Sequence, residues 1–174
     1  MTTHPDPGSD RGRDTARARR RYGRRSQPRY SRPVSEQVWR IEPSGPLRGD
    51  VEVRGSKNAV SKHMVAAMLG EGPSTLHNTP EVGEVGITAA MLRAVGIDVE
   101  VNGMEITVER GSEIRPHVPE AFTGLNRIPI LMLGPLLHLA GEAFVPFVGG
   151  DPIGRRPVNY HVDALRAMGA EVEV

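Results

Sequence analysis

A short segment occurs twice in this chain, and it limits what the chain can fold into more than any other feature. Residues 92–101 read Leu-Arg-Ala-Val-Gly-Ile-Asp-Val-Glu-Val, and residues 165–174 read Leu-Arg-Ala-Met-Gly-Ala-Glu-Val-Glu-Val. Seven of the ten positions are identical, at a spacing of 73 residues. Each copy has the pattern of a helix end, a glycine stop and a strand. We therefore expect an α/β (α+β) fold assembled from copies of one supersecondary unit.

The rest of the pattern supplies the elements of such a unit. Apolar residues at helical spacing predict helices at residues 59–69, 84–95, 128–139 and 159–168, the third with a bend near Gly134-Pro135. Short apolar or alternating runs predict strands at residues 38–41, 47–53, 75–78, 97–101, 104–108, 143–148 and 170–174. Asn102-Gly103 favours a hairpin turn in the first copy. The second copy has no such hairpin, so we expect about two repeat units of an incomplete domain.

The beginning of the chain has a different composition. Residues 1–33 hold ten arginines against three aspartates and almost no large aliphatic side chains. Such a segment cannot bury enough apolar surface to offset the entropy of ordering it. We expect a disordered Arg-rich tail at residues 1–37 and the partial domain at residues 38–174. The alternative interpretation is an arm that binds nucleic acid. We favour a solvated extension, because no pattern of stacking aromatic residues accompanies the charge.

Composition also excludes several classes of function. The chain has no cysteine, which excludes a disulfide framework, a thiolate metal site and a cysteine nucleophile. It has no apolar run long enough for a membrane span and no apolar segment of a secretory leader. The histidines do not have metal-ligand spacing. We expect a cytoplasmic protein without a metal or cofactor, and the sequence leaves the oligomeric state open.

Two short motifs could bind anions. Gly55-Ser56-Lys57-Asn58 lies between a predicted strand and a predicted helix, where backbone amides and the charge of Lys57 would favour a phosphate or carboxylate. The alternative is a capped helix with a surface lysine. Arg127 directly precedes a buried apolar helix, so its guanidinium either extends to solvent or is held by an anion.

The third motif is the richest. Residues 149–157 read Gly-Gly-Asp-Pro-Ile-Gly-Arg-Arg-Pro, a loop that can approach a ligand closely. Its Asp151 is a candidate proton carrier, and Arg155 and Arg156 are candidate anion ligands. A surface loop with an Arg–Asp pair is the alternative. We expect His161, in the helix that follows, to be a packing residue.

These three motifs, in this order, resemble the UDP-N-acetylglucosamine 1-carboxyvinyltransferases, a family of enolpyruvyl transferases. The first resembles the family's Gly-[Ala/Ser]-Lys-Asn-[Ala/Ser] segment, and residues 127–136 resemble its Arg-to-Leu-Gly-Pro-Leu helix. Residues 149–157 resemble its catalytic loop, Gly-Gly-[Cys/Asp]-x-Ile-Gly-x-Arg-Pro. The resemblance covers residues 38–174 and implies repeated βαβαββ units of the inverse α/β barrel type.

The resemblance implies a role for each matching residue. Lys57 and Arg156 would contact the phosphate or carboxylate of phosphoenolpyruvate, and Asp151 would donate a proton to its methylene carbon. Asn58 and Arg127 would help to hold the UDP-sugar.

Two departures from the family pattern concern the acceptor. Asn159 stands where the family commonly has aspartate beside the uracil site. Ile128-Pro129 replaces a small residue and a serine, a change that could alter how the sugar nucleotide is held.

The implied reaction transfers enolpyruvyl from phosphoenolpyruvate to the 3-hydroxyl of UDP-N-acetylglucosamine, the first committed step of peptidoglycan synthesis. One alternative is an enolpyruvyl transferase for another nucleotide, such as UMP in nucleoside-antibiotic synthesis. Another is a non-catalytic remnant that binds anions or nucleic acid. Members of the family are well over twice as long, and the resemblance places their base aspartate and a further arginine beyond residue 174. We therefore expect no transferase activity from these 174 residues alone.

Overall fold

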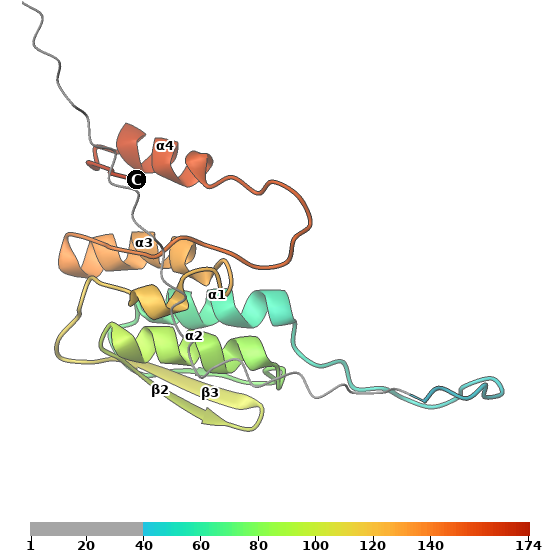
Figure 1. Cartoon of the computed structure of the whole chain (residues 1–174). Coiled ribbons are helices and arrows are strands. Elements are labelled where there is room, and N and C mark those ends of the chain that lie inside the picture. Colours follow the sequence, from blue (N-terminus) through green and yellow to red (C-terminus); the bar gives the residue numbers. More distant parts are fainter. Residues whose placement is uncertain (1–39) are drawn as a thin grey trace, which may run out of the picture. The chain divides into compact units, whose positions relative to one another are not determined.

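A computed structural model describes residues 40–174, so the predicted tail at residues 1–37 lies outside the described residues. Four α-helices, three strands and one short 3₁₀ helix follow one another within the described part (Figure 1). They are α1 (Lys57–Ala67), β1 (Ser74–Leu76), α2 (Gly83–Ala94), β2 (Ile97–Asn102), β3 (Glu105–Arg110), η1 (Glu120–Phe122), α3 (Ile128–Ala140) and α4 (Asn159–Ala167). The four predicted helices and the three central predicted strands are confirmed, with boundaries that shift by at most two residues.

The three strands form an antiparallel sheet in the order β1-β3-β2. Asn102 pairs with Glu105, so the two residues of the hairpin loop are Gly103 and Met104. Gly103 has a φ of +57°, and glycine at the first loop position suits a type II′ turn. The predicted hairpin is confirmed, but its turn lies one residue later than Asn102-Gly103 suggested.

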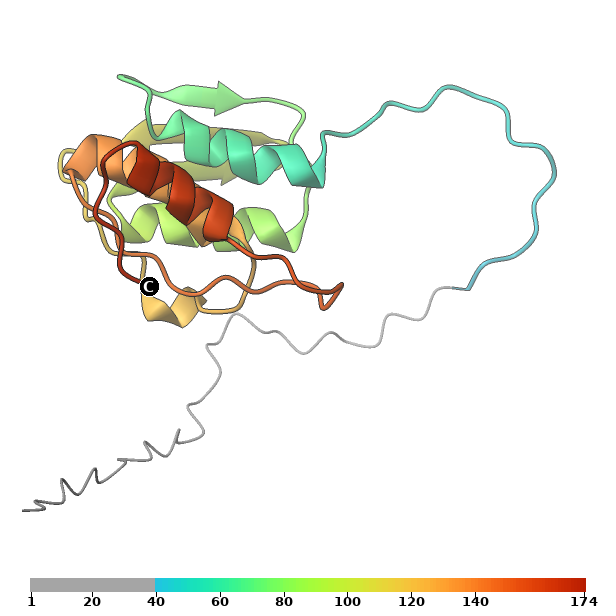
Figure 2. The same ribbon diagram turned by 90° about the horizontal axis from the view of Figure 1, so that it is seen from above.

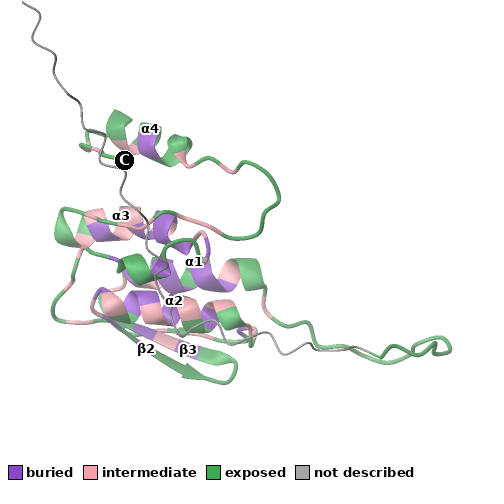
Figure 3. Cartoon of the chain, in the orientation of Figure 1, coloured by how far each residue is buried: buried purple, intermediate pink, exposed green. Residues whose placement is uncertain are grey.

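The helices cover one face of this sheet. Helices α1 and α2 pack against the strands and each other, α3 packs against α1, and α4 lies over α3 on the side away from the sheet (Figures 1 and 2). Figure 3 shows buried residues on α1, α2, α3 and the strands of the sheet, whereas α4 is mostly exposed. Because aromatic residues are few, methionine and branched aliphatic side chains fill the core. The largest fully buried side chains include Met64, Met68, Met91, Leu92, Ile97, Ile106, Ile128, Met132 and Leu136.

Helix α3 is the most apolar helix of the described part. It starts with a proline in its first turn, where the missing N–H costs nothing, and contains a second, Pro135. Gly141 ends it in the left-handed region at φ +79°, and its N–H donates to the Leu137 carbonyl. Within residues 40–174, no helix is both long and apolar enough to cross a membrane.

The internal repeat is visible as a repeated contact. Arg93, near the end of α2, donates from Nε to the Val99 carbonyl of β2 at 3.1 Å. Arg166, near the end of α4, donates from Nη2 to the Val172 carbonyl at 2.8 Å. In each pair the donor and the acceptor are six residues apart in sequence. The glycine between them, Gly96 or Gly169, has a positive φ. The two copies therefore share a glycine turn after the helix, which an arginine side chain fastens to the following segment; that segment is a strand only in the first copy.

Four predicted strands are not formed among the described residues. Residues 47–53 are irregular and exposed, as are Arg40 and Ile41 from the predicted strand 38–41. Residues 143–148 contribute only one isolated parallel bridge, between His117 and Phe144. Residues 170–174 are irregular. An apolar or alternating run favours a strand, but the strand forms only where a neighbouring strand pairs with it, and the run does not specify that neighbour.

We predict that the two glycines of the repeat differ in importance. At Gly96 (φ +90°) a Cβ would lie 2.0 Å from the Glu113 carbonyl oxygen, whereas at Gly169 (φ +97°) it would have no neighbour within 4 Å. Gly96→Ala should lower the free energy of unfolding by about 3 kcal/mol, and Gly169→Ala by about 1 kcal/mol. Urea unfolding of both variants measures the difference. Equal losses would mean that the backbone contact at Gly96 contributes nothing.

Candidate functional site

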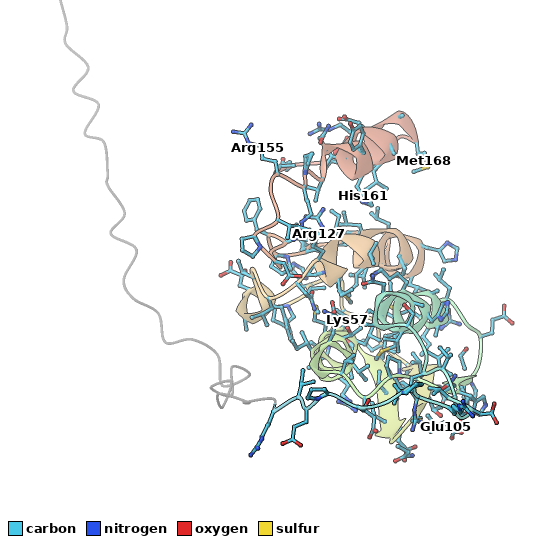
Figure 4. All side chains as sticks on the ribbon, turned by 90° about the vertical axis from the view of Figure 1, so that its right-hand side faces the viewer. Lys57, Glu105, Arg127, Arg155, His161 and Met168 are labelled. Carbon is cyan, nitrogen blue, oxygen red and sulfur yellow. The ribbon has the colours of Figure 1, made fainter. Side chains whose placement is uncertain are left out.

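A cleft of about 670 Å³ opens where the first turns of α1, α2 and α3 meet the loop before α4. Five of the six predicted site residues line it: Lys57, Asn58, Arg127, Asp151 and Arg156. They come from three segments that are far apart in sequence. Figure 4 shows Lys57 of α1, Arg127 at the start of α3 and His161 of α4 on successive layers of the molecule.

The α1 side of the cleft is a capped helix start. Ser56 is the N-cap residue, and its hydroxyl oxygen accepts the Asn58 backbone N–H at 3.2 Å. Lys57 Nζ lies 3.5 Å from Oε2 of Glu84, which belongs to the first turn of α2. The lysine side chain is 60% exposed and the glutamate 21%. Lys57 is therefore tethered at the edge of the cleft by a weak, partly hydrated ion pair.

Two arginines fasten the loop on the other side. Arg127 donates from Nη1 to the Arg156 carbonyl at 2.9 Å, and Arg156 donates from Nη2 to the Asp151 carbonyl at 2.8 Å. Both arginines are half-buried and Asp151 is exposed. The Asp151 carboxylate forms no ion pair within residues 40–174, so the Arg–Asp interaction here uses the backbone and leaves the acid free.

The base of the loop is anchored through backbone atoms. The Gly149 N–H donates to the Asn126 carbonyl, and the Gly124 N–H donates to the Phe147 carbonyl, both at 2.9 Å. A Cβ at Gly149 would lie 2.0 Å from the Gly124 carbonyl oxygen. Only glycine allows these two chain segments to approach so closely.

The other predicted or suspected residues divide into two groups. Asn159 is exposed in the first turn of α4 and does not line the cleft, and Arg155 is exposed and projects outward (Figure 4). His161, expected to be a packing residue at the helix N-terminus, is exposed and lines the cleft.

The sequence reasoning also missed Lys62, which lines the cleft four residues after Asn58. That spacing puts both side chains on one face of α1 and could have revealed it. With Lys57, Arg127 and Arg156, the cleft has four cationic side chains against the carboxylates of Glu84 and Asp151. Its charge suits an anionic ligand. Within the described residues, no group of three or more His, Asp or Glu side chains could hold a metal ion.

Known proteins resemble this chain over most of its described length. The family model of EPSP synthase (3-phosphoshikimate 1-carboxyvinyltransferase) matches residues 41–174. The chain belongs to the EPSP synthase family. It is 44% identical over 135 residues to the UDP-N-acetylglucosamine 1-carboxyvinyltransferase of Halorhodospira halophila, covering 77% of this chain and 32% of the relative. The enzyme of the same name from Protochlamydia amoebophila is 38% identical over 142 residues, covering 78% and 30%.

The chain therefore spans about a third of the length of these curated relatives. Among solved structures, the enolpyruvyl transferase NikO from Streptomyces tendae matches with a TM-score of 0.49 and 24% identity, over 55% of this chain and 22% of NikO.

The structure also accounts for one departure from the family pattern. Ile128 is 2% exposed and Pro129 is buried, both in the first turn of α3. Proline suits this position, and the isoleucine adds to the core. Packing therefore accounts for the Ile128-Pro129 pair, and Ile128 also lines the cleft.

We predict that Gly149→Ala detaches the base of the loop. The added Cβ cannot fit beside the Gly124 carbonyl, so both backbone hydrogen bonds of this anchor should break. Amide hydrogen exchange at positions 124 and 149 should accelerate at least tenfold. Gly134→Ala, whose Cβ would have no neighbour within 4 Å, is the matched control and should leave both amides protected. Unchanged exchange in Gly149→Ala would show that the anchor tolerates a side chain.

Proposed function

We propose that this chain forms the phosphoenolpyruvate-binding part of an enolpyruvyl transferase that acts on UDP-N-acetylglucosamine. One observation carries the proposal: five residues, chosen from three separate sequence motifs, line a single cleft rich in positive charge. Family membership supports the reaction class. The names of the relatives support the acceptor.

The cationic groups suit the donor substrate. Phosphoenolpyruvate carries a phosphate and a carboxylate, and Lys57 and Arg156 would each neutralise part of this charge. The capped start of α1 adds the partial positive charge of its free backbone amides. Asn58 and Arg127, on the same walls, would orient the sugar nucleotide.

Asp151 would supply the proton of the first chemical step. The 3-hydroxyl group of the sugar would lose its proton to a base that the family resemblance places outside these 174 residues. Its oxygen would bond to C2 of phosphoenolpyruvate while Asp151 protonates C3, which gives a tetrahedral intermediate with a methyl group. The Asp151 carboxylate would then take a proton back from the methyl group, the bond from C2 to the phosphate oxygen would break, and the double bond would re-form as inorganic phosphate departs. Nearby cations stabilise the negative charge that develops on the phosphate.

This proposal predicts binding of phosphoenolpyruvate by the 174-residue chain. Lys57→Ala and Arg156→Ala should each weaken binding roughly tenfold, because each removes a charge-assisted contact. Arg110→Ala, which removes a cation at the end of β3 outside the cleft, should change the dissociation constant less than twofold. Isothermal titration calorimetry at one salt concentration measures all four proteins. Equal affinity in the wild type and both cleft variants would overturn the assignment of these residues.

The role of Asp151 predicts a separation of binding from turnover. Asp151→Ala should retain phosphoenolpyruvate affinity within about threefold, because its carboxylate makes no ion pair in the described part of the chain. In this chain joined to the remaining two-thirds of a curated relative, the same change should lower phosphate release by at least a hundredfold. Near-normal phosphate release would make Asp151 a structural loop residue.

A further inference from the structure

Only one of the two polar atoms in the Asn126 side chain has a hydrogen-bond partner within the described part of the chain. Asn126 lines the cleft but is only 7% exposed. Its Oδ1 accepts the Ile128 backbone N–H at 2.9 Å. Its Nδ2 is covered from solvent and has no hydrogen-bond partner within the described part of the chain.

The orientation of this amide is determined by its surroundings. Exchanging Oδ1 and Nδ2 would set the amide N–H group against the Ile128 N–H, so that two donors would face each other. Oδ1 therefore accepts the N–H at the start of α3, and Nδ2 is the atom without a partner in the described part of the chain. A buried donor without an acceptor costs about 1–3 kcal/mol, so such groups are rare in native proteins.

Asn126 lies at the point where the two arginines and the loop are joined. Its backbone carbonyl accepts the Gly149 N–H, and the next residue, Arg127, donates from its guanidinium group to the Arg156 carbonyl. Arg127 and Arg156 both donate from their guanidinium groups to neutral backbone carbonyls. An oxyanion is a stronger acceptor than a carbonyl and would compete for the same donors. Binding of an anion would therefore loosen the loop beside Asn126 and bring an acceptor close to Nδ2.

We propose that Asn126 Nδ2 is a ligand-binding donor that bonds to an oxygen of the oxyanion held by Arg127 and Arg156. This inference rests on the proposed function, because it requires an anionic ligand in the cleft. The oxyanion belongs either to phosphoenolpyruvate or to the diphosphate of the sugar nucleotide. Hydrogen-bond chemistry is the same for both sources, so each is a separate arm of the test.

Two substitutions separate the donor from the structural role of the residue. Asn126→Asp and Asn126→Ser both keep an oxygen that can accept the Ile128 N–H, and both remove the amide donor. The first adds a charge and the second does not. Asn102→Asp makes the same chemical change as the first at the exposed end of β2, outside the cleft. The melting temperatures of all three variants should lie within a few degrees of that of the wild type.

The 174-residue chain and these variants are titrated separately with phosphoenolpyruvate and with UDP-N-acetylglucosamine by calorimetry. We expect both Asn126 variants to bind one of the two ligands roughly tenfold more weakly, and Asn102→Asp to bind as the wild type does. The ligand whose affinity falls is the source of the oxyanion. In nitrogen–proton spectra, that ligand should shift the Asn126 side-chain amide signal of the wild type.

The remaining outcomes overturn the inference in distinguishable ways. Wild-type affinity in Asn126→Ser, together with an unmoved Asn126 amide signal, would assign Nδ2 to a buried water and leave the proposed function intact. Weaker binding in Asn126→Asp alone would be a charge effect and would also remove the donor role. Absence of binding of either ligand by the wild type would overturn the proposed function, and the Asn126 inference with it.

Discussion

Four backbone hydrogen bonds join residues 116–126, before α3, to residues 144–149, after it. This backbone ladder holds the cleft together. Phe144 exchanges hydrogen bonds with Pro116 and Val118, and two further bonds link Gly124 to Phe147 and Gly149 to Asn126, all between 2.8 and 2.9 Å. The chain leaves this ladder, forms α3 and returns to it, so the start of α3 and the loop before α4 are held side by side. Arg127 and the loop can meet only because this ladder fixes the distance between their backbones.

Local patterns were sufficient to predict the helices and the central hairpin. The apolar stripe of residues 59–69 predicts a helix, and Gly96, with its positive φ, predicts where the next helix ends. Both signals depend only on residues that are close in sequence. The strand at residues 47–53 failed for the opposite reason. Its alternation is real, yet Val51 and Val53 are 87% and 79% exposed, because strand formation depends on a partner that the pattern itself does not specify.

The site was predictable where chemistry and motif coincide, and less so elsewhere. Lys57, Arg127 and Arg156 carry charges that need a partner or a ligand, so motifs alone indicated them. Asn126 has no charge and stands in no motif, and its unpaired amide is visible only when the neighbouring atoms are in place. Asn159 was predicted from its match to a family position, and in the structure it is exposed in the first turn of α4 and does not line the cleft.

Three of the four cations of the cleft, Lys57, Arg127 and Arg156, contact partners that an anionic ligand can displace. Lys57 is 3.5 Å from a carboxylate and 60% exposed, and such an ion pair is worth at most about 1 kcal/mol. Arg127 and Arg156 donate to neutral carbonyls, which bind a guanidinium less strongly than an oxyanion does. These contacts restrict the side chains before a ligand arrives, which lowers the entropy lost on binding. Stronger internal ion pairs would restrict them further, but the ligand would then have to break them, so weak partners are the arrangement that favours binding.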